Sequence, residues 1–341
     1  MEIEEKIKKY FESLKPQNLG LIDRIKLISV RKLGVGSSNL NYLVNVGNKK
    51  FIFRLNVYSP EERRSKKEFI ALKAVEHLKI APKVWLLDDS HKDFEESFII
   101  LDYISGKSLD SLNKSITPQI IVKVARLAAS LHNLNIKSIN TLHINQEGYL
   151  YYIKELKEYK EQFREFTNNS LFFELLDITY SKLEALLSLE KDRAYPLSLI
   201  HSDIQEQNLI KNGNKLYLID WEGLNIADPA WEVAYIFCDF GRPFKESEKE
   251  LFYKEYLKLR KDTYIRERIK LYEVIRYVDG FLWAVIHALR VIHNKVSKEF
   301  SRRTNLDSHI KFAEKVFRRA LDVGVIDKKY KDFDLRKELL K

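Results

Sequence analysis

The pattern of apolar residues changes about a third of the way along the chain, and this change limits the folds that the chain can adopt. The first hundred residues alternate strand-like runs with turns. The clearest pair is LNYLVNV and FIFRLNV on either side of Gly47-Asn48, a typical β-hairpin turn. Residues 27–33, 83–87 and 97–103 predict further strands, while residues 1–15 and the segment after Pro60 predict helices. Beyond residue 105 the apolar residues recur mostly at helical spacing, and strands followed by helices are typical of an α+β protein.

This organisation predicts two lobes with a cleft between them: a small, β-rich lobe of residues 1–104 and a larger, mostly helical lobe of residues 105–341. One stretch of the second lobe departs from the helical pattern. In LSLIHSDIQEQNLIKNGNKLYLIDWEG, which begins at Leu197, two short apolar runs flank a polar loop and an Asn212-Gly213-Asn214 turn. We expect short β-ribbons here that hold the polar loop in place.

Charge and composition favour a globular protein without a disulfide framework. The 341 residues carry 59 Lys and Arg against 49 Asp and Glu, a net charge of +10, and 45% of the residues are apolar. The positive excess is spread along the chain, so we interpret the basic clusters as solvated helix faces in preference to a nucleic-acid surface. A single cysteine, Cys238, excludes an intramolecular disulfide and a cysteine-based zinc site.

The sequence also predicts a cytoplasmic protein without a membrane-spanning segment. The first 15 residues carry charges throughout and lack the apolar stretch of a signal peptide. The longest aliphatic and aromatic run, Phe281–Leu289, is too short to cross a bilayer.

One window of this basic chain is acidic. Between residues 203 and 232 there are only two lysines, against six carboxylates: Asp203, Glu206, Asp220, Glu222, Asp228 and Glu232. Such a window indicates a metal ion or a cationic substrate. Asp228 directly precedes Pro229, which favours a loop-shaping role for its carboxylate.

The central motif of the window is His201-x-Asp203-x4-Asn208, followed by Leu-Ile-Asp220-Trp-Glu222. An Asp and an Asn five residues apart on a loop, with a second Asp on the next strand, supply the hard oxygen ligands that Mg²⁺ prefers. One carboxylate then remains to accept a proton from a substrate hydroxyl. This is the layout of phosphoryl transfer, with one base and two metal ligands. We expect His201 to shape the loop through hydrogen bonds to the backbone.

A second signal lies upstream, between two predicted strands. The loop Gly34-Val35-Gly36-Ser37-Ser38-Asn39 has glycines that let a backbone approach a phosphate and bind it with N–H groups. Arg54 ends the run FIFR, and Glu68 follows on the predicted helix. A cation over the phosphates, fixed by a carboxylate on a helix, is the expected partner of such a loop.

Taken in order, these motifs resemble the aminoglycoside phosphotransferase / choline kinase superfamily, a branch of the protein-kinase-like fold. H-S-D-I-Q-E-Q-N-L-I and L-I-D-W-E resemble the catalytic loop and metal motif of that family. L-A-A-S-L-H-N-L resembles its helix before the catalytic lobe, and D-P-A-W-E-V-A resembles its D-P-x-x-D motif, with Glu232 where Asp is usual. The motifs span roughly Val30 to Cys238.

The resemblance implies an enzyme that uses ATP or another nucleoside triphosphate together with Mg²⁺. It makes Asp203 the catalytic base and assigns Asn208 and Asp220 to the metal. It places Arg54 where the family has a phosphate-contacting lysine, with Glu68 as its ion-pair partner. The remaining nucleotide contacts implied are the glycine-rich loop and the backbone of the strand FIILDYI, at Gly34, Gly36, Ser37, Ser38, Asn39, Asp102 and Ile104.

The resemblance also implies that the acceptor is a hydroxyl of a small-molecule alcohol. Cationic acceptors such as choline, ethanolamine, thiamine or an aminoglycoside suit the acidic window, and the candidate contacts are Glu206, Glu222 and Trp283. Trp283 lies in a segment that resembles the choline-kinase substrate helix, where aromatic rings surround a quaternary ammonium. A place in the protein core is an equal alternative for Trp283, and Trp221 and Trp231 could add to such a cage. Two other functions stay open: a kinase of RNA or another macromolecule, and a nucleotide-binding pseudokinase.

Overall fold

The computed structural model describes residues 2–22, 27–35, 39–56, 63–112, 116–136, 149–188, 196–295 and 306–339. The chain divides into two compact units. Unit 1 consists of Met1–His143, Ser198–Ile226 and Lys245–Lys261, and unit 2 of Ile144–Leu197, Ala227–Phe244 and Asp262–Lys341. The predicted fold class is confirmed, because a β-sheet region at the N-terminus is followed by a mostly helical region.

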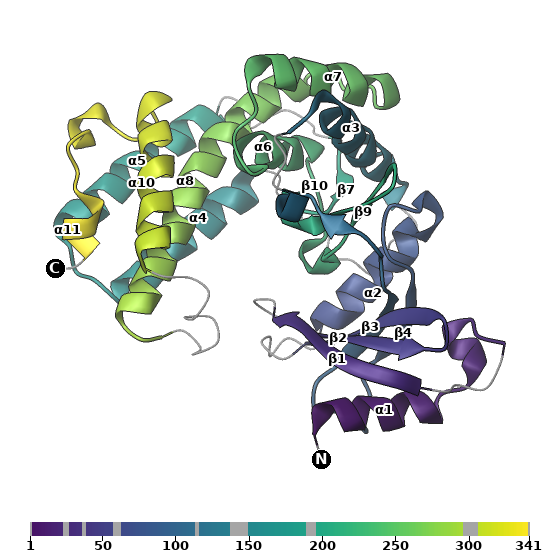
Figure 1. The fold of residues 1–341 in the computed structure, drawn as a ribbon. Helices are drawn as coiled ribbons and strands as arrows, with labels where there is room; N and C mark the ends of the chain where they lie inside the picture. The colour runs from purple at the N-terminus through teal and green to yellow at the C-terminus, as the bar shows by residue number, and fades with distance from the viewer. Residues whose placement is uncertain are drawn as a thin grey trace. The chain divides into compact units, whose positions relative to one another are not determined.

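The main sheet of unit 1 has five antiparallel strands in the order β1-β2-β3-β5-β4 (Figure 1). They are β1 Leu27–Val35, β2 Asn39–Val46, β3 Lys49–Asn56, β4 Val84–Asp88 and β5 Phe98–Asp102. The predicted hairpin joins β2 to β3: Val46 pairs with Lys49 across the two-residue turn, and Gly47 has a φ of +59°. Glycine adopts this left-handed conformation without steric cost.

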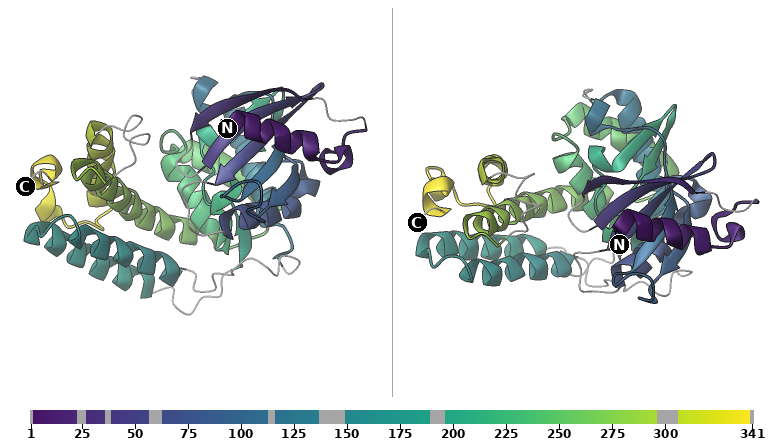
Figure 2. Two further views of the ribbon diagram at one scale, coloured as in Figure 1. Left: turned by 90° about the horizontal axis from the view of Figure 1, so that it is seen from below. Right: turned by 60° about the horizontal axis from the view of Figure 1, so that its bottom comes forward.

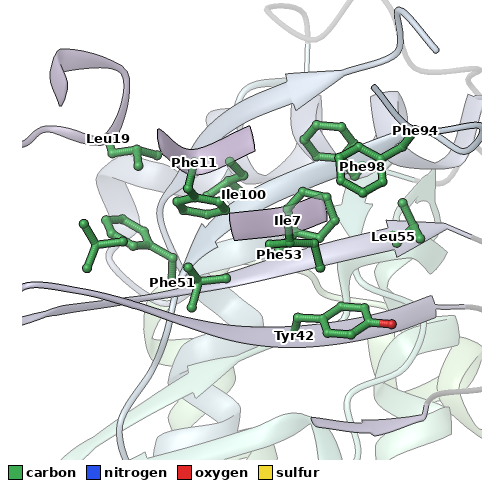
Figure 3. Packing of buried hydrophobic residues seen from close by; sticks show 12 residues of the cluster. Ile7, Phe11, Leu19, Tyr42, Phe51, Phe53, Leu55, Phe94, Phe98 and Ile100 are labelled. Carbon is green, nitrogen blue, oxygen red and sulfur yellow. The ribbon is translucent and has the colours of Figure 1, made fainter. Parts of the chain in front are cut away.

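The two faces of this sheet have different covers. Successive side chains of a strand point to opposite faces, so Phe51 and Phe53 share one face of β3 while Arg54 lies on the other. The first face packs against α1 (Ile3–Ser13), whose Ile7 and Phe11 are buried in an aromatic cluster. Figure 3 shows these rings between the helix and the strands. The opposite face therefore lies toward α2 (Arg63–Val75), which Arg54 contacts through Glu68.

Elsewhere in unit 1, the described residues form short strands and two further α-helices. The hairpin of β8 (Leu209–Asn212) and β9 (Lys215–Leu218) forms a three-stranded sheet with β6 (Lys107–Ser108), and β7 (Ser198–Ile200) pairs with β10 (Asn225–Ala227). Helix α3 (Pro118–His132) is capped by Thr117, whose side chain accepts a hydrogen bond from the N–H of Ile120. It packs on α7 (Glu246–Leu259), where His132 Nδ1 lies 2.7 Å from the Tyr256 hydroxyl.

Unit 2 is helical. The helices that the structure describes there are α4 Tyr149–Arg164, α5 Ser170–Ser188, α6 Pro229–Asp239, α8 Ile265–Ile292, α10 Leu306–Asp322 and α11 Leu335–Leu339. Both views of Figure 2 show α4 and α5 side by side. Asp228 caps α6 by accepting a hydrogen bond from Ala230 N–H at 2.9 Å, and Arg268 of α8 pairs with its carboxylate at 2.8 Å. Asp228 thus caps a helix, where the sequence predicted a loop-shaping carboxylate. Within the described residues, no helix has the length and hydropathy needed to cross a bilayer.

A pair of glycine substitutions tests the packing beneath the N-terminal sheet. Gly20 has a φ of +60°, and a Cβ atom there would lie 2.4 Å from the Trp85 ring, whereas a Cβ at Gly47 meets nothing within 4 Å. We expect Gly47→Ala to cost about 1–2 kcal/mol of unfolding free energy from backbone strain alone. Gly20→Ala should cost more, because it adds a steric clash to the same strain. Equal losses in urea unfolding would contradict this account.

Candidate functional site

Asn208 and Asp220 are brought together by the β8–β9 hairpin. The strands pair from Asn212 and Lys215 at the turn to Leu209 and Leu218 at the open end. Beyond that end, the N–H of Ile219 donates to the carbonyl of Asn208 at 2.9 Å. The two residues are therefore at the same end of the hairpin, although eleven positions separate them in the sequence.

Asp203 is held directly by Asn208. The carboxamide nitrogen Nδ2 of Asn208 donates to Asp203 Oδ2 at 2.7 Å and to the Asp203 carbonyl at 3.0 Å. Both partners can only accept, so they fix which end of the buried carboxamide is the nitrogen. The Oδ1 atom of Asn208 is then the atom left to bind a cation. The half-buried Asp203 carboxylate, a candidate proton acceptor, is thus tied to a candidate metal ligand.

His201 braces the loop from beneath. It is fully buried, and its Nδ1 accepts a hydrogen bond from the N–H of Asp203 at 3.3 Å. Because Nδ1 accepts, the ring proton of the neutral imidazole is on Nε2, which lies 3.1 Å from the Ile219 carbonyl and donates to it. The histidine joins the Asp203 loop to the strand end before Asp220, as the sequence predicted. The ring of the buried Trp221 meets it edge-on at 4.8 Å.

The backbone is left-handed in both segments that His201 joins. Ser202 has a φ of +71° and Asp220 a φ of +67°. Non-glycine residues adopt this conformation only at a cost, and Asp and Asn tolerate it best. Strained residues of this kind cluster at functional sites. Here they lie next to His201 and at the end of the hairpin.

Arg54 lies at the centre of the charged groups. Only 8% of it is exposed, and its Nη1 donates to Glu68 Oε1 at 2.7 Å and to Asp220 Oδ1 at 3.0 Å. Glu68 is 3% exposed. Burial acts to lower the pKa of Arg54, but Glu68 and Asp220 outweigh it and hold that pKa above its ordinary value. The guanidinium is therefore a permanent positive charge beside the two carboxylates, as the predicted ion pair with Glu68 requires.

The glycine-rich loop is described only at its two ends. Gly34 lies in β1 and Asn39 begins β2, whereas Gly36, Ser37 and Ser38 lie outside the described residues. Asn39 is buried, and its Nδ2 donates to Glu222 Oε2 at 2.8 Å. This hydrogen bond links the start of β2 to the segment that follows Asp220.

The proposed nucleotide-base contacts lie at the end of β5. The N–H of Asp102 donates to the Lys83 carbonyl at 2.8 Å, and its carboxylate accepts from Trp85 Nε1 at 2.6 Å. The N–H of Asp102 is thus committed to the sheet. Any contact of Asp102 with a base falls to its carbonyl oxygen, and the contacts predicted for Asp102 and Ile104 stay predictions.

The three tryptophans considered for an aromatic cage differ in their surroundings. Trp221 is fully buried, so it cannot reach a ligand. The Arg276 guanidinium lies 5.6 Å from the centre of the Trp231 ring and 4.1 Å from that of Tyr235, so a cation of the protein covers these rings. Trp283 is 41% exposed on α8, with the His287 ring 4.2 Å away.

The two candidate carboxylates Glu206 and Glu222 belong to unit 1. Glu206 is half-buried, and its carbonyl accepts a hydrogen bond from Leu109 N–H at 3.1 Å. Glu222 is held by Asn39. The assignment of Glu206, Glu222 and Trp283 to an acceptor stays a prediction.

The donor atoms fit a magnesium ion that arrives with its substrate. The described residues include no group of three or more His, Cys, Asp or Glu side chains that could hold a metal ion. The two predicted ligands are the carboxamide oxygen of Asn208 and the carboxylate of Asp220, whose side chain is 36% exposed. Mg²⁺ usually takes one or two carboxylates together with waters and substrate phosphates. A pair of oxygen ligands is sufficient for such an ion.

Sequence reasoning missed Asn41, which accepts a hydrogen bond from Arg54 Nε at 3.0 Å. The signal was present in the alternation of β2. Asn39 and Asn41 lie on one face of β2. Tyr42 and Val44 lie on its other face and are buried in the apolar core.

Comparison with known proteins gives one family match. The model of a family described as the phosphotransferase enzyme family matches residues 29–272. A search of the curated proteins finds no match.

Solved structures share the fold. Choline kinase from Cryptosporidium parvum Iowa II is 20% identical with a TM-score of 0.62, over 93% of this chain and 94% of that one. Ethanolamine kinase from Plasmodium vivax is 15% identical with a TM-score of 0.63, over 94% and 88% of the two chains. The GDP and kanamycin complex of APH(2")-IIia is 16% identical with a TM-score of 0.62, over 86% and 95%. These similarities confirm the fold predicted from the motifs.

Replacing His201 tests its role as a brace. His201→Ala leaves the Asp203 N–H and the Ile219 carbonyl without their partner and opens a cavity beside Trp221. We expect it to lower the free energy of unfolding by about 2–4 kcal/mol. His77→Ala, at an exposed histidine, serves as the control and should change little. The measurement is chemical unfolding at pH 7, and equal effects of the two variants would refute the brace.

The imidazole next to Trp283 predicts a pH dependence of stability. Burial lowers the pKa of His287 from 6.5 to about 4. As the pH falls below 6.5, the unfolded chain takes up a proton that the folded chain refuses, so stability is full above pH 6.5 and falls toward pH 4. The contribution of this one group is at most about 1.4 kcal/mol per pH unit. We expect His287→Gln to flatten the loss between pH 6.5 and 4.5, and His77→Gln to leave it unchanged.

Proposed function

We propose, because the chain belongs to the phosphotransferase enzyme family, that it transfers the γ-phosphoryl group of ATP or another nucleoside triphosphate to a hydroxyl of a small-molecule alcohol. The observation that carries this proposal is the hydrogen-bonded array in unit 1. Asp203 is tied to Asn208, Asn208 to the strand end before Asp220, Asp220 to Arg54, and Arg54 to Glu68. A candidate base, two oxygen ligands and a fixed cation are thus held together.

In the proposed reaction, Asp203 accepts the proton of the acceptor hydroxyl. The hydroxyl oxygen forms a bond to the γ-phosphorus, and the bond from that phosphorus to the β,γ-bridging oxygen breaks. The electron pair leaves with the nucleoside diphosphate. Asn208 supports this role because its Nδ2 donates to Asp203 Oδ2 and so fixes the orientation of the carboxylate. General base catalysis of this kind contributes about 10²–10⁴-fold to rate.

Asn208 and Asp220 would hold Mg²⁺, which supplies charge neutralisation at the phosphates when bound. The protein itself supplies a further positive charge, the Arg54 guanidinium, and Glu68 keeps this group in place. The nucleotide would further contact the loop from Gly34 to Asn39 and the backbone at Asp102 and Ile104. The structural neighbour with bound GDP and kanamycin supports a nucleotide donor and an acceptor with hydroxyl groups.

We propose an acceptor that also carries an amine, with Glu206, Glu222 and Trp283 as its candidate contacts. The support is the acidic window around Asp203 and the names of the neighbours, which are a choline kinase, an ethanolamine kinase and a kanamycin complex. A matching first panel is choline, ethanolamine, thiamine and aminoglycosides, with sugars, nucleosides and bulk RNA as uncharged and macromolecular alternatives.

The test is transfer of labelled γ-phosphate from Mg-ATP and Mg-GTP to these pooled acceptors. We expect Asp203→Ala to lower turnover by about 100-fold or more while nucleotide binding survives. Asp220→Ala should instead weaken the binding of the Mg-nucleotide itself, because it removes a metal ligand. Asp89→Ala, at an exposed acidic residue outside this array, is the control and should match the unsubstituted protein.

Three outcomes would contradict the proposal. Nucleotide binding without transfer to any pool favours a nucleotide-binding pseudokinase. Full transfer by Asp203→Ala removes that residue from the role of base. Transfer to bulk RNA alone, with strong dependence on salt, would replace the small-molecule acceptor by a nucleic acid.

A further inference from the structure

We propose that Asn41 is a positioning residue for Arg54. By holding Nε, its carboxamide fixes the plane of the guanidinium and leaves the Nη2 amino group to bind a nucleotide phosphate. This inference rests on the proposed function and extends it to a residue on β2. Asn41 itself touches neither nucleotide nor acceptor in this proposal and acts only through Arg54.

The register of the sheet places Asn41 beside Arg54. The two residues are direct cross-strand partners in the β2–β3 hairpin, and eight consecutive pairs run from Asn39 and Asn56 to Val46 and Lys49 without a bulge. Cross-strand partners have their Cβ atoms about 4.5–5.5 Å apart on one face. The distance of 3.0 Å from Arg54 Nε to Asn41 Oδ1 is therefore set by a continuous ladder of backbone hydrogen bonds.

The opposite face of β2 makes this register rigid. Tyr42 and Val44 are buried in the aromatic cluster under α1, so they anchor the strand on the side away from Arg54 (Figure 3 labels Tyr42). A slip of one residue would turn both away from this cluster, to the face that lies toward α2, and bring Asn41 into the apolar core. The apolar cluster thus fixes the position of a polar side chain that it does not touch.

The donors of Arg54 are divided among its partners. A guanidinium carries one N–H on Nε and two on each terminal nitrogen. Nε donates to Asn41, and Nη1 donates to both Glu68 and Asp220. Among the described residues, Nη2 has no hydrogen-bond partner. Its two N–H groups are the ones that remain for the planar recognition of a phosphate, for which arginine is suited.

The contact with Asn41 has an effect because position 54 holds an arginine and not a lysine. The two carboxylates constrain the guanidinium at one terminal nitrogen only, and the contact at Nε adds a fixed point on another atom, which limits the tilt of the planar group about Nη1. A lysine ammonium has three equivalent N–H groups and no counterpart of Nε, so Asn41 could not orient it in this way. Because the Asn41 carboxamide is a neutral hydrogen-bond acceptor, it also avoids placing a third negative charge where phosphates must bind.

The first test compares Asn41→Leu with Asn41→Thr. Leucine has nearly the shape of asparagine but accepts no hydrogen bond, whereas the threonine hydroxyl can accept one and suits a strand. We expect Asn41→Leu to raise both the Kd and the KM of the Mg-nucleotide about tenfold or more. The Kd is measured by calorimetry with a non-hydrolysable analogue. The fall in kcat should be smaller, and Asn41→Thr should recover most of the affinity.

Asn45→Leu is the matched control. Asn45 lies on the same face of β2, and its Nδ2 donates to the exposed Ser29 hydroxyl at 2.7 Å. We expect this variant to keep the nucleotide affinity of the unsubstituted protein. Should Asn41→Leu fail to fold, Asn41→Ala carries the same expectation. Unchanged nucleotide affinity in Asn41→Leu, or in Asn41→Ala where that variant replaces it, would refute the proposal.

A double-mutant cycle separates positioning from a general loss of structure. Arg54→Lys removes Nε, so in that background Asn41→Leu should change the Kd less than twofold, against about tenfold beside Arg54. Equal factors in both backgrounds would mean that Asn41 does not act through Arg54. If the unsubstituted protein binds no nucleotide, the proposed function fails; if it binds and transfers phosphate while Asn41→Leu does the same, only this inference fails.

Discussion

A buried guanidinium, that of Arg54, connects three segments of unit 1 that belong to the candidate site. Arg54 contacts β2 through Asn41, α2 through Glu68 and the end of the β8–β9 hairpin through Asp220. Taking an ion out of water costs several kcal/mol, and only close, well-directed partners offset this cost. The guanidinium has such partners on three separate segments of unit 1. Each of these segments therefore has to be in place before the charge can be buried.

The backbone around Asp203 and Asp220 depends on a second buried polar group. His201 accepts from one loop and donates to the other, and both of its neighbours in this arrangement, Ser202 and Asp220, have left-handed backbone conformations. Such conformations persist only where the surroundings determine them. The buried imidazole and the Trp221 ring supply those surroundings. The local strain is thus balanced by packing beneath the loop, and hydrogen bonds within the protein hold the polar atoms of Asp203 and Asn208.

The acidic window turns out to serve more than one purpose. Asp228 and Glu232 are fully buried in unit 2, and Asp228 caps α6 and pairs with Arg268. The carboxylates of Asp203 and Asp220 instead belong to the hydrogen-bonded array of unit 1, and that of Glu222 accepts a hydrogen bond from Asn39. Arg276 similarly lies over the rings of Trp231 and Tyr235 and pairs with Asp239, so the protein supplies its own cation to that aromatic surface. The composition of a window indicates its charge, and only the fold assigns each charge a partner.

Much of the architecture could be predicted from local pattern. The two hairpin turns, the strand runs before and after them and the helical spacing beyond residue 105 are properties of neighbouring residues, and the ordered motifs around Asp203 and Asp220 indicated the family. Asn41 could not be assigned in the same way, because its role depends on which residue of β3 lies opposite. The burial of Trp221 and the covering of Trp231 by Arg276 depend likewise on contacts between distant segments. The sequence by itself determined the elements and the chemical groups available, since turns and periodicity act over a few residues. The tertiary structure alone decided which groups meet, since strand register and burial bring together atoms that are far apart along the chain.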